Sequence, residues 1–167
     1  MSWLESAADA ASPFEGVLSL RPELLRLYRT FYGTLWDHHL VAANLLELCR
    51  LRIAAIHDCE AERAIRHATA GVTDEQVAAL ADWRAAACFS PAERAVLAFA
   101  EKMPWQHQGV TDDDVAAVRT HLTDPQVVAL TVALTLFDAN CRLRLVLGVA
   151  PQALLVDTPA SARGVLY

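Results

Sequence analysis

The chain has 167 residues, of which 54% are hydrophobic and 20% charged, and its formal net charge is −6 at pH 7. A chain of this length is the size of one domain with one buried core, and its richness in Ala and Leu excludes extended disorder and a β-sandwich. Its single lysine, Lys102, leaves no basic surface of the kind that nucleic acid requires.

Neither a targeting signal nor a membrane span is expected. Residues 1–5 lack the basic and apolar regions of a signal peptide, and the scattered cysteines are too few for a disulfide scaffold. Residues 127–137 are uncharged, but a membrane span needs about 20 apolar residues, so we interpret them as part of a buried helix. We therefore expect a cytoplasmic protein without a membrane or nucleic-acid partner.

Helix signals begin at Pro22, which fits the first turn of a helix predicted over residues 22–35. A second helix is predicted over residues 40–56, and its apolar residues nearly encircle it, which indicates a central, buried position. A third is predicted from Cys59 to Gly71, with Asp58 as its cap.

The later helices are predicted from their N-terminal caps. In a capping box, a hydroxyl residue and a Glu or Gln three residues later accept hydrogen bonds from each other's backbone N–H groups. The sequence has this pattern at Thr73, Ser90 and Thr123, and each predicts the start of a helix. Thr111 precedes three aspartates, which favour the positive end of a helix dipole. The sequence therefore predicts an all-α domain of six or seven helices over residues 21–150, flanked by arms at 1–20 and 151–167.

Most of the reactive side chains fall between Glu47 and His67. On the predicted third helix, Cys59, Glu62 and Arg66 lie within about 60° of one another and share a face, and His67 lies about 80° from Cys59. Glu47 lies in an apolar helix, where an unpaired carboxylate is costly. It is therefore either a site residue beside a polar pocket or half of a buried pair with an arginine such as Arg50, Arg52 or Arg142.

Four stretches, residues 47–59, 71–76, 89–94 and 138–149, together resemble the carboxymuconolactone decarboxylase and alkylhydroperoxidase D-like (AhpD-like) proteins. The resemblance covers roughly residues 22–150. It implies an all-helical, AhpD-like bundle that assembles into homo-oligomers, either trimers or hexamers.

The peroxidase members of that family use a glutamate twelve residues before the first cysteine of a Cys-x-x-Cys-x-x-x-His motif. Glu47 stands twelve residues before Cys59, so these two positions match. Glu62 takes the place of the second cysteine and Arg66 that of the histidine, which leaves the dithiol relay incomplete. Nothing in the sequence indicates that Cys49, Cys88 or Cys141 supplies the missing thiol.

The decarboxylases of the family act without a cofactor on a small dicarboxylate lactone. That reaction needs an acid or base to move a proton and a cation to hold a carboxylate, and Glu62 and Arg66 could supply them. They could equally form an ordinary ion pair on a helix surface. Likewise, Cys59 could be a small buried apolar residue, and His57 or His67 a capping or surface group.

Three functions therefore stay open: a peroxidase-related antioxidant protein, a cofactor-free acid–base enzyme, and a non-catalytic ligand-binding or interaction module. The substrate would be a hydroperoxide or a small carboxylate. No cofactor is expected, and no metal site at His38 and His39, because adjacent helix residues point in different directions. The candidate catalytic residues are Glu47, Cys59, Glu62, Arg66 and His67.

Overall fold

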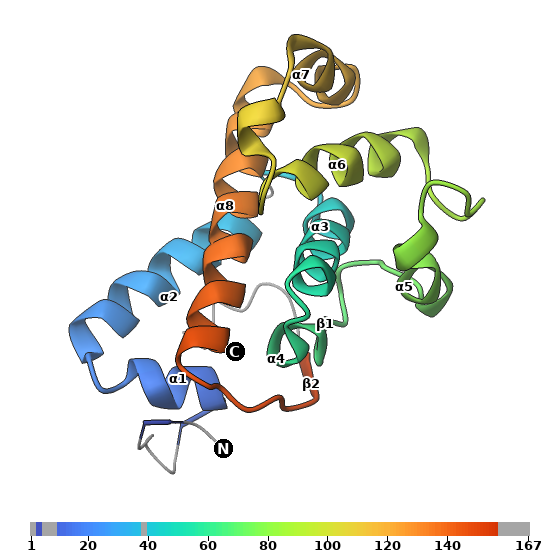
Figure 1. Ribbon diagram of the computed structural model, residues 1–167. Coiled ribbons are helices and arrows are strands. Elements are labelled where there is room, and N and C mark those ends of the chain that lie inside the picture. The colour runs from blue at the N-terminus through green and yellow to red at the C-terminus, as the bar shows by residue number, and fades with distance from the viewer. Residues whose placement is uncertain (1–2, 5–9, 38–39, 157–167) are drawn as a thin grey trace.

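The computed structural model describes residues 3–4, 10–37 and 40–156, and within them it contains eight α-helices (Figure 1). The longest, α8 (Asp124–Val146), lies between α2 (Pro22–Asp37) and α3 (Ala43–Ile56). Helix α3 packs against both α8 and α6 (Pro91–Lys102), so it is central, as its apolar circumference predicts. His38 and His39 lie outside the described residues.

The shorter elements complete the bundle. The remaining α-helices are α1 (Pro13–Leu18), α4 (Glu60–Arg63), α5 (Asp74–Ala79) and α7 (Asp112–Arg119), and the short 3-10 helices are η1 (Leu80–Asp82) and η2 (His107–Gly109). Capping boxes are present at the four predicted positions, Thr73, Ser90, Thr111 and Thr123, which confirms these helix starts. Helix α1 lies within the predicted N-terminal arm, yet it buries Phe14 in the core.

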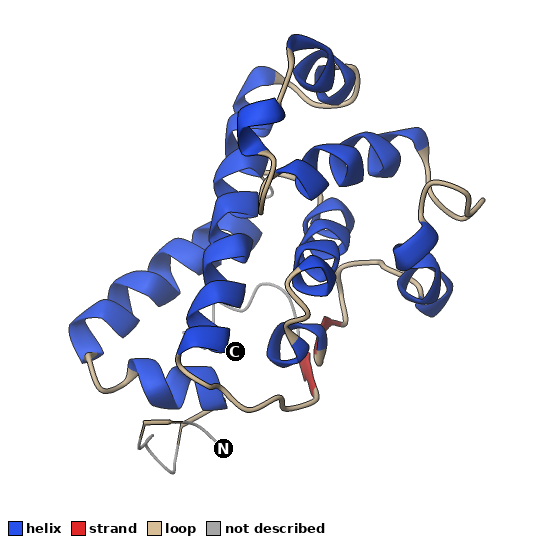
Figure 2. Ribbon diagram, in the orientation of Figure 1, coloured by secondary structure: helices blue, strands red, loops and turns tan. Residues whose placement is uncertain are grey.

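The predicted third helix is wrong beyond Arg63. The chain instead forms strand β1 (Ile65–His67), which pairs in parallel with β2 (Leu154–Val156), as Figure 2 shows in red. The alternation of burial along β1, with Ile65 and His67 buried and Arg66 half-buried, suits a strand. Its partner comes from the predicted C-terminal arm, so no local helix signal reveals the pairing.

The helix predicted to begin at Thr73 is short. Helix α5 ends at Ala79, and the chain turns through η1. The Arg94 guanidinium donates to the backbone carbonyls of Trp83, Arg84 and Ala86, so these acceptors are satisfied without a continuing helix.

Helix α8 is the buried core helix that its apolar stretch predicts. It is long and apolar enough to cross a membrane by length and composition. However, Leu130, Leu134 and Phe137 are fully buried against the rest of the domain. Leu145, near the end of α8, is 45% exposed.

Helices α3 and α8 end in the same kind of turn. After α3, Asp58 adopts a positive φ of 50°, the Cys59 N–H donates to the Ala54 carbonyl (2.9 Å), and the Asp58 N–H donates to that of Ala55 (3.2 Å). This pair of hydrogen bonds is a Schellman motif with aspartate in the position that usually holds glycine. Gly148 has the corresponding position after α8, with a φ of 61°. The first of these turns fixes the backbone of Cys59.

Candidate functional site

A buried ion pair lies at the centre of the region that the sequence singles out. Glu47 and Arg50, one turn apart on α3, are both 0% exposed. The Arg50 guanidinium donates from Nε to Glu47 Oε2 (2.8 Å) and from Nη2 to Glu47 Oε1 (2.9 Å), which is a two-pronged contact. Of the alternatives left open by the sequence, the structure therefore shows Glu47 paired with Arg50.

Arg50 also binds the segment that follows α3. Its Nη1 donates to the Glu62 side chain (Oε2, 2.7 Å) and backbone carbonyl (2.8 Å), and its Nη2 donates to the Ile65 carbonyl (2.6 Å). All five guanidinium N–H donors thus have acceptors. The second oxygen of Glu62 accepts from Arg144 Nε of α8 (3.1 Å). Two carboxylates and two guanidinium groups therefore join α3, α4, β1 and α8.

Glu47 is a counter-ion in this network, and its charge is maintained by its partners. Burial by itself would raise the pKa of Glu47, but the Arg50 guanidinium and a hydrogen bond from the His67 backbone N–H (3.1 Å) lower it below the ordinary carboxyl value. Both Glu47 and Glu62 are engaged by Arg50. The arrangement therefore leaves neither carboxylate in the position of a solvent-accessible acid or base.

The other two predicted site residues lie at the edge of the network. The His67 ring stacks on Trp36, with ring centroids 3.9 Å apart, and burial lowers the pKa of His67 to about 3, so the ring is neutral at pH 7. Arg66 Nε lies 3.9 Å from Glu47 Oε1, and Arg66 Nη1 lies 3.5 Å from Asp74. Arg66 therefore lies beside Glu47 and Asp74, and the structure does not show the Arg66–Glu62 ion pair that the sequence allows.

Cys59 lies at the start of α4, and its sulfur meets α8. Its thiol donates to the Cys141 backbone carbonyl, with Sγ 3.9 Å from the oxygen. The neighbouring Cys141 side chain lowers the pKa of Cys59 against the opposing effect of burial. The Cys59 side chain and burial both raise the pKa of Cys141. Of the two neighbouring thiols, Cys59 is therefore the one that loses its proton more readily.

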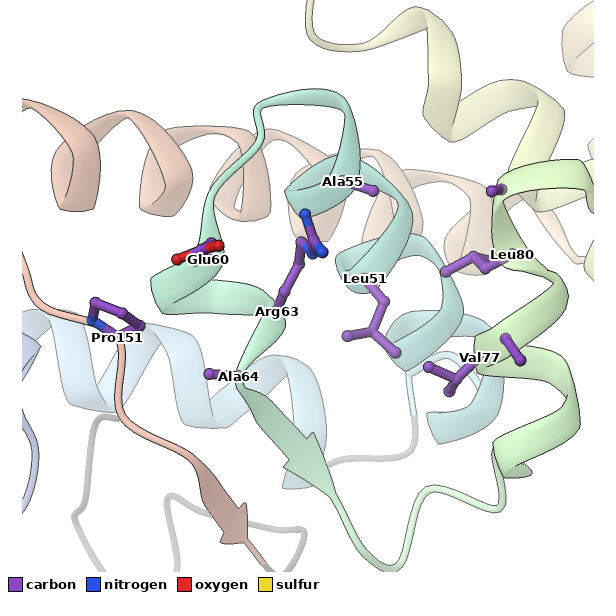
Figure 3. Close-up of a pocket in the computed structure, with 10 residues that line it drawn as sticks. Leu51, Ala55, Glu60, Arg63, Ala64, Val77, Leu80 and Pro151 are labelled. Atoms are coloured by element: carbon purple, nitrogen blue, oxygen red, sulfur yellow. The ribbon is translucent and has the colours of Figure 1, made fainter.

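A cavity of about 350 Å³ opens beside Cys59, between the turns that end α3 and α8. Its wall includes Arg144 and the apolar side chains of Leu145, Val149 and Pro151. A larger pocket of about 630 Å³ shares Glu60 and Pro151 with it, and Figure 3 shows Leu51 and Leu80 along the far side of that pocket. Neither pocket is lined by Glu47 or Glu62.

Sequence reasoning missed two residues of this arrangement, Cys141 and Arg144, which α8 brings to Cys59 and Glu62. A weak signal exists, because Arg144 lies one turn after Cys141 on the same predicted helix. His57 is the C-terminal cap residue of α3, and its Nε2 lies 2.6 Å from Asp138 Oδ1, on a different part of α8.

The comparisons with known proteins agree on the fold. The model of the carboxymuconolactone decarboxylase family matches residues 22–102. A protein of unknown function from Agrobacterium tumefaciens, ATU0492, for which the name antioxidant defence protein AhpD has been suggested, superposes with a TM-score of 0.69 at 18% identity, covering 83% of this chain and 97% of its own.

A second solved structure is the alkylhydroperoxidase AhpD core of an uncharacterised peroxidase-related protein from Ralstonia eutropha JMP134. It has a TM-score of 0.66 and 22% identity, and the match covers 82% of this chain and 75% of that one. No curated protein matches the chain. Residues 22–102 therefore match the carboxymuconolactone decarboxylase family, and the fold of the chain is the helical fold of the AhpD-like solved structures.

Proposed function

We propose that this protein is a peroxidase-related member of its family and that the Cys59 thiol is the group that reacts with a hydroperoxide. The observation behind this proposal is the position of Cys59, which lines a cavity together with Arg144 and contacts Cys141 of α8 through its thiol (Sγ to the backbone carbonyl, 3.9 Å). The match to the family and the peroxidase-related names of the structural neighbours support the same chemistry.

The reaction needs a thiolate with access to a peroxide. The Cys59 thiolate attacks the outer oxygen of the hydroperoxide, the O–O bond breaks, and Cys59 becomes a sulfenic acid. The alkoxide or hydroxide that leaves takes up the proton that the Cys59 thiol released and departs as an alcohol or water. The Glu62 carboxylate opposes the thiolate and the Arg144 guanidinium favours it, and Arg144 is itself held by Glu62 and by the face of Phe14, 4.2 Å away. The apolar wall of the cavity suits a small organic hydroperoxide.

In this proposal Glu47 has a structural role. It holds Arg50, which binds the Glu62 and Ile65 carbonyls and so fixes the turn that carries Cys59. The Glu62 backbone N–H in turn donates to the Cys59 carbonyl (3.1 Å). The network therefore orders the segment around the thiol, and the reacting atoms belong to Cys59.

The proposal is tested by site-resolved oxidation of the full chain. The protein is treated with limiting cumene hydroperoxide and dimedone, which traps sulfenic acids, and the labelled cysteines are identified by mass spectrometry. Cys59 should be labelled first in the earliest samples, well ahead of Cys49, which is a buried thiol in α3 and serves as the internal control. Peroxide consumption should be lost in Cys59→Ser and retained in Cys88→Ser. Equal, slow reaction of all four cysteines would reject the proposal.

A further inference from the structure

We propose that Cys141 is the resolving thiol of this site and that it forms an intramolecular disulfide with Cys59 between the start of α4 and helix α8. The inference rests on the proposed function of Cys59. It assigns the missing second thiol to a residue 82 positions away in sequence, which no Cys-x-x-Cys spacing would reveal.

The contact between the two cysteines supports this pairing. The Cys59 Sγ lies 3.9 Å from the Cys141 backbone carbonyl, and each residue is almost completely buried, with Cys59 0% and Cys141 1% exposed. To form a disulfide, the two sulfur atoms must come within about 2.05 Å of each other. The backbones on both sides are well held, because Cys59 belongs to the turn that ends α3 and Cys141 lies inside α8.

The other cysteines are directed elsewhere. The Cys49 thiol donates to the Val96 carbonyl of α6 (3.7 Å), and burial raises its pKa. Cys88 lies between η1 and α6, where its carbonyl accepts from Gln76 (3.3 Å). Among the four cysteines, all within the described residues, Cys141 is the one that the structure shows in contact with the Cys59 thiol.

The chemistry balances with one hydroperoxide. After Cys59 is oxidised, the Cys141 sulfur attacks the sulfenic acid, an S–S bond forms, the S–O bond breaks, and the hydroxide leaves with the Cys141 proton as water. The two thiols thereby give two electrons to the peroxide. An external dithiol then reduces the disulfide by two exchange steps.

Two oxidants separate this inference from the proposed function. Diamide links neighbouring thiols without any peroxide chemistry, whereas hydrogen peroxide requires a reactive thiolate. Trypsin cuts after Lys and Arg, and places the four cysteines on the separate peptides 30–50, 53–63, 85–94 and 120–142. A Cys59–Cys141 disulfide is therefore identified directly as a cross-link of peptides 53–63 and 120–142 under non-reducing conditions.

We expect that cross-link with both oxidants, in the wild type and in the Cys49→Ser control. In Cys141→Ser, or in Cys141→Ala if serine is tolerated poorly in the core, peroxide should leave Cys59 as a sulfenic acid. Dimedone added only after the oxidation should then label Cys59 stoichiometrically in the variant and almost not at all in the wild type. Circular dichroism checks that the variants are folded.

Two results overturn the inference: no Cys59–Cys141 cross-link with diamide, or a persistent Cys59 sulfenic acid in the wild type. Persistent sulfenic acid still supports the proposed function, because Cys59 has then reacted with peroxide. A cross-link with diamide and no reaction of Cys59 with peroxide supports the pairing of the thiols. That last result rejects the proposed function, and with it a resolving role for Cys141.

Discussion

Replacing Arg50 with Met removes the cation that lies between two buried carboxylates. Glu47 and Glu62 are 0% and 2% exposed, so neither can regain its lost interactions from water. After the substitution, Glu62 keeps Arg144, whereas the nearest remaining cation to Glu47 is Arg66 at 3.9 Å. Breaking a buried pair by removing one partner costs about 3–5 kcal/mol. Because two carboxylates lose a partner here, we expect a loss of about 5 kcal/mol.

This loss is measurable by urea unfolding followed by circular dichroism. The matched control is Arg119→Met, whose ion pair with Asp124 is exposed on both sides and should contribute about 1 kcal/mol or less. Glu47→Gln should cost about 3 kcal/mol, since it leaves Arg50 only one carboxylate. The rate of Cys59 oxidation per folded molecule should change little, because Glu47 does not line the cavity. An Arg50→Met variant no less stable than the Arg119→Met control would refute this reasoning.

Three further predictions follow from other parts of the structure. Because burial lowers the pKa of His67 from 6.5 to about 3, the unfolded chain binds a proton that the folded chain does not. The free energy of unfolding should therefore fall as the pH drops below 6.5, by up to about 1.4 kcal/mol per pH unit. The variant His67→Phe keeps an aromatic ring stacked on Trp36, and it should remove this dependence between pH 6.5 and 4.5 when urea unfolding is measured at each pH. Asp58 has a φ of 50°, so Asp58→Ala should destabilise the turn by about 1–2 kcal/mol and Asp58→Gly should not, as thermal unfolding would show. If the chain is a homo-oligomer that buries the apolar side chains exposed on α2, Phe31→Glu should lower the mass measured by light scattering, whereas an unchanged mass would exclude this face from the interface.

The helix boundaries could be predicted because their signals are local. Thr73, Ser90 and Thr111 each accept a hydrogen bond from the backbone N–H three residues later, and the Thr123 backbone N–H donates to the Gln126 side chain (3.0 Å). The sequence also predicts that Glu47, if not a site residue, has a charged partner, because a carboxylate in an apolar helix must be paired. Arg50, one turn away, is that partner.

The rest depends on contacts between distant segments. The sequence predicts a helix where strand β1 forms. The partner strand, β2, lies almost ninety residues later in the chain and pairs with β1 through backbone groups, so no local side-chain pattern reveals the pairing. The same holds for Cys141 and Arg144, which reach Cys59 and Glu62 only because α8 packs against α4. Side-chain spacing on one helix cannot reveal neighbours that tertiary packing supplies.

The most direct test of the account is the rate at which hydrogen peroxide oxidises each cysteine as a function of pH, resolved by peptide. The lowered pKa of Cys59 predicts that its oxidation is faster than that of Cys49 at pH 7 and reaches half its maximum below the ordinary thiol value of 9.0. Cys49, whose pKa burial raises, should stay slow throughout this range. If Cys59 reacts no faster than Cys49 at any pH, the central claim that Cys59 is a reactive thiol is contradicted.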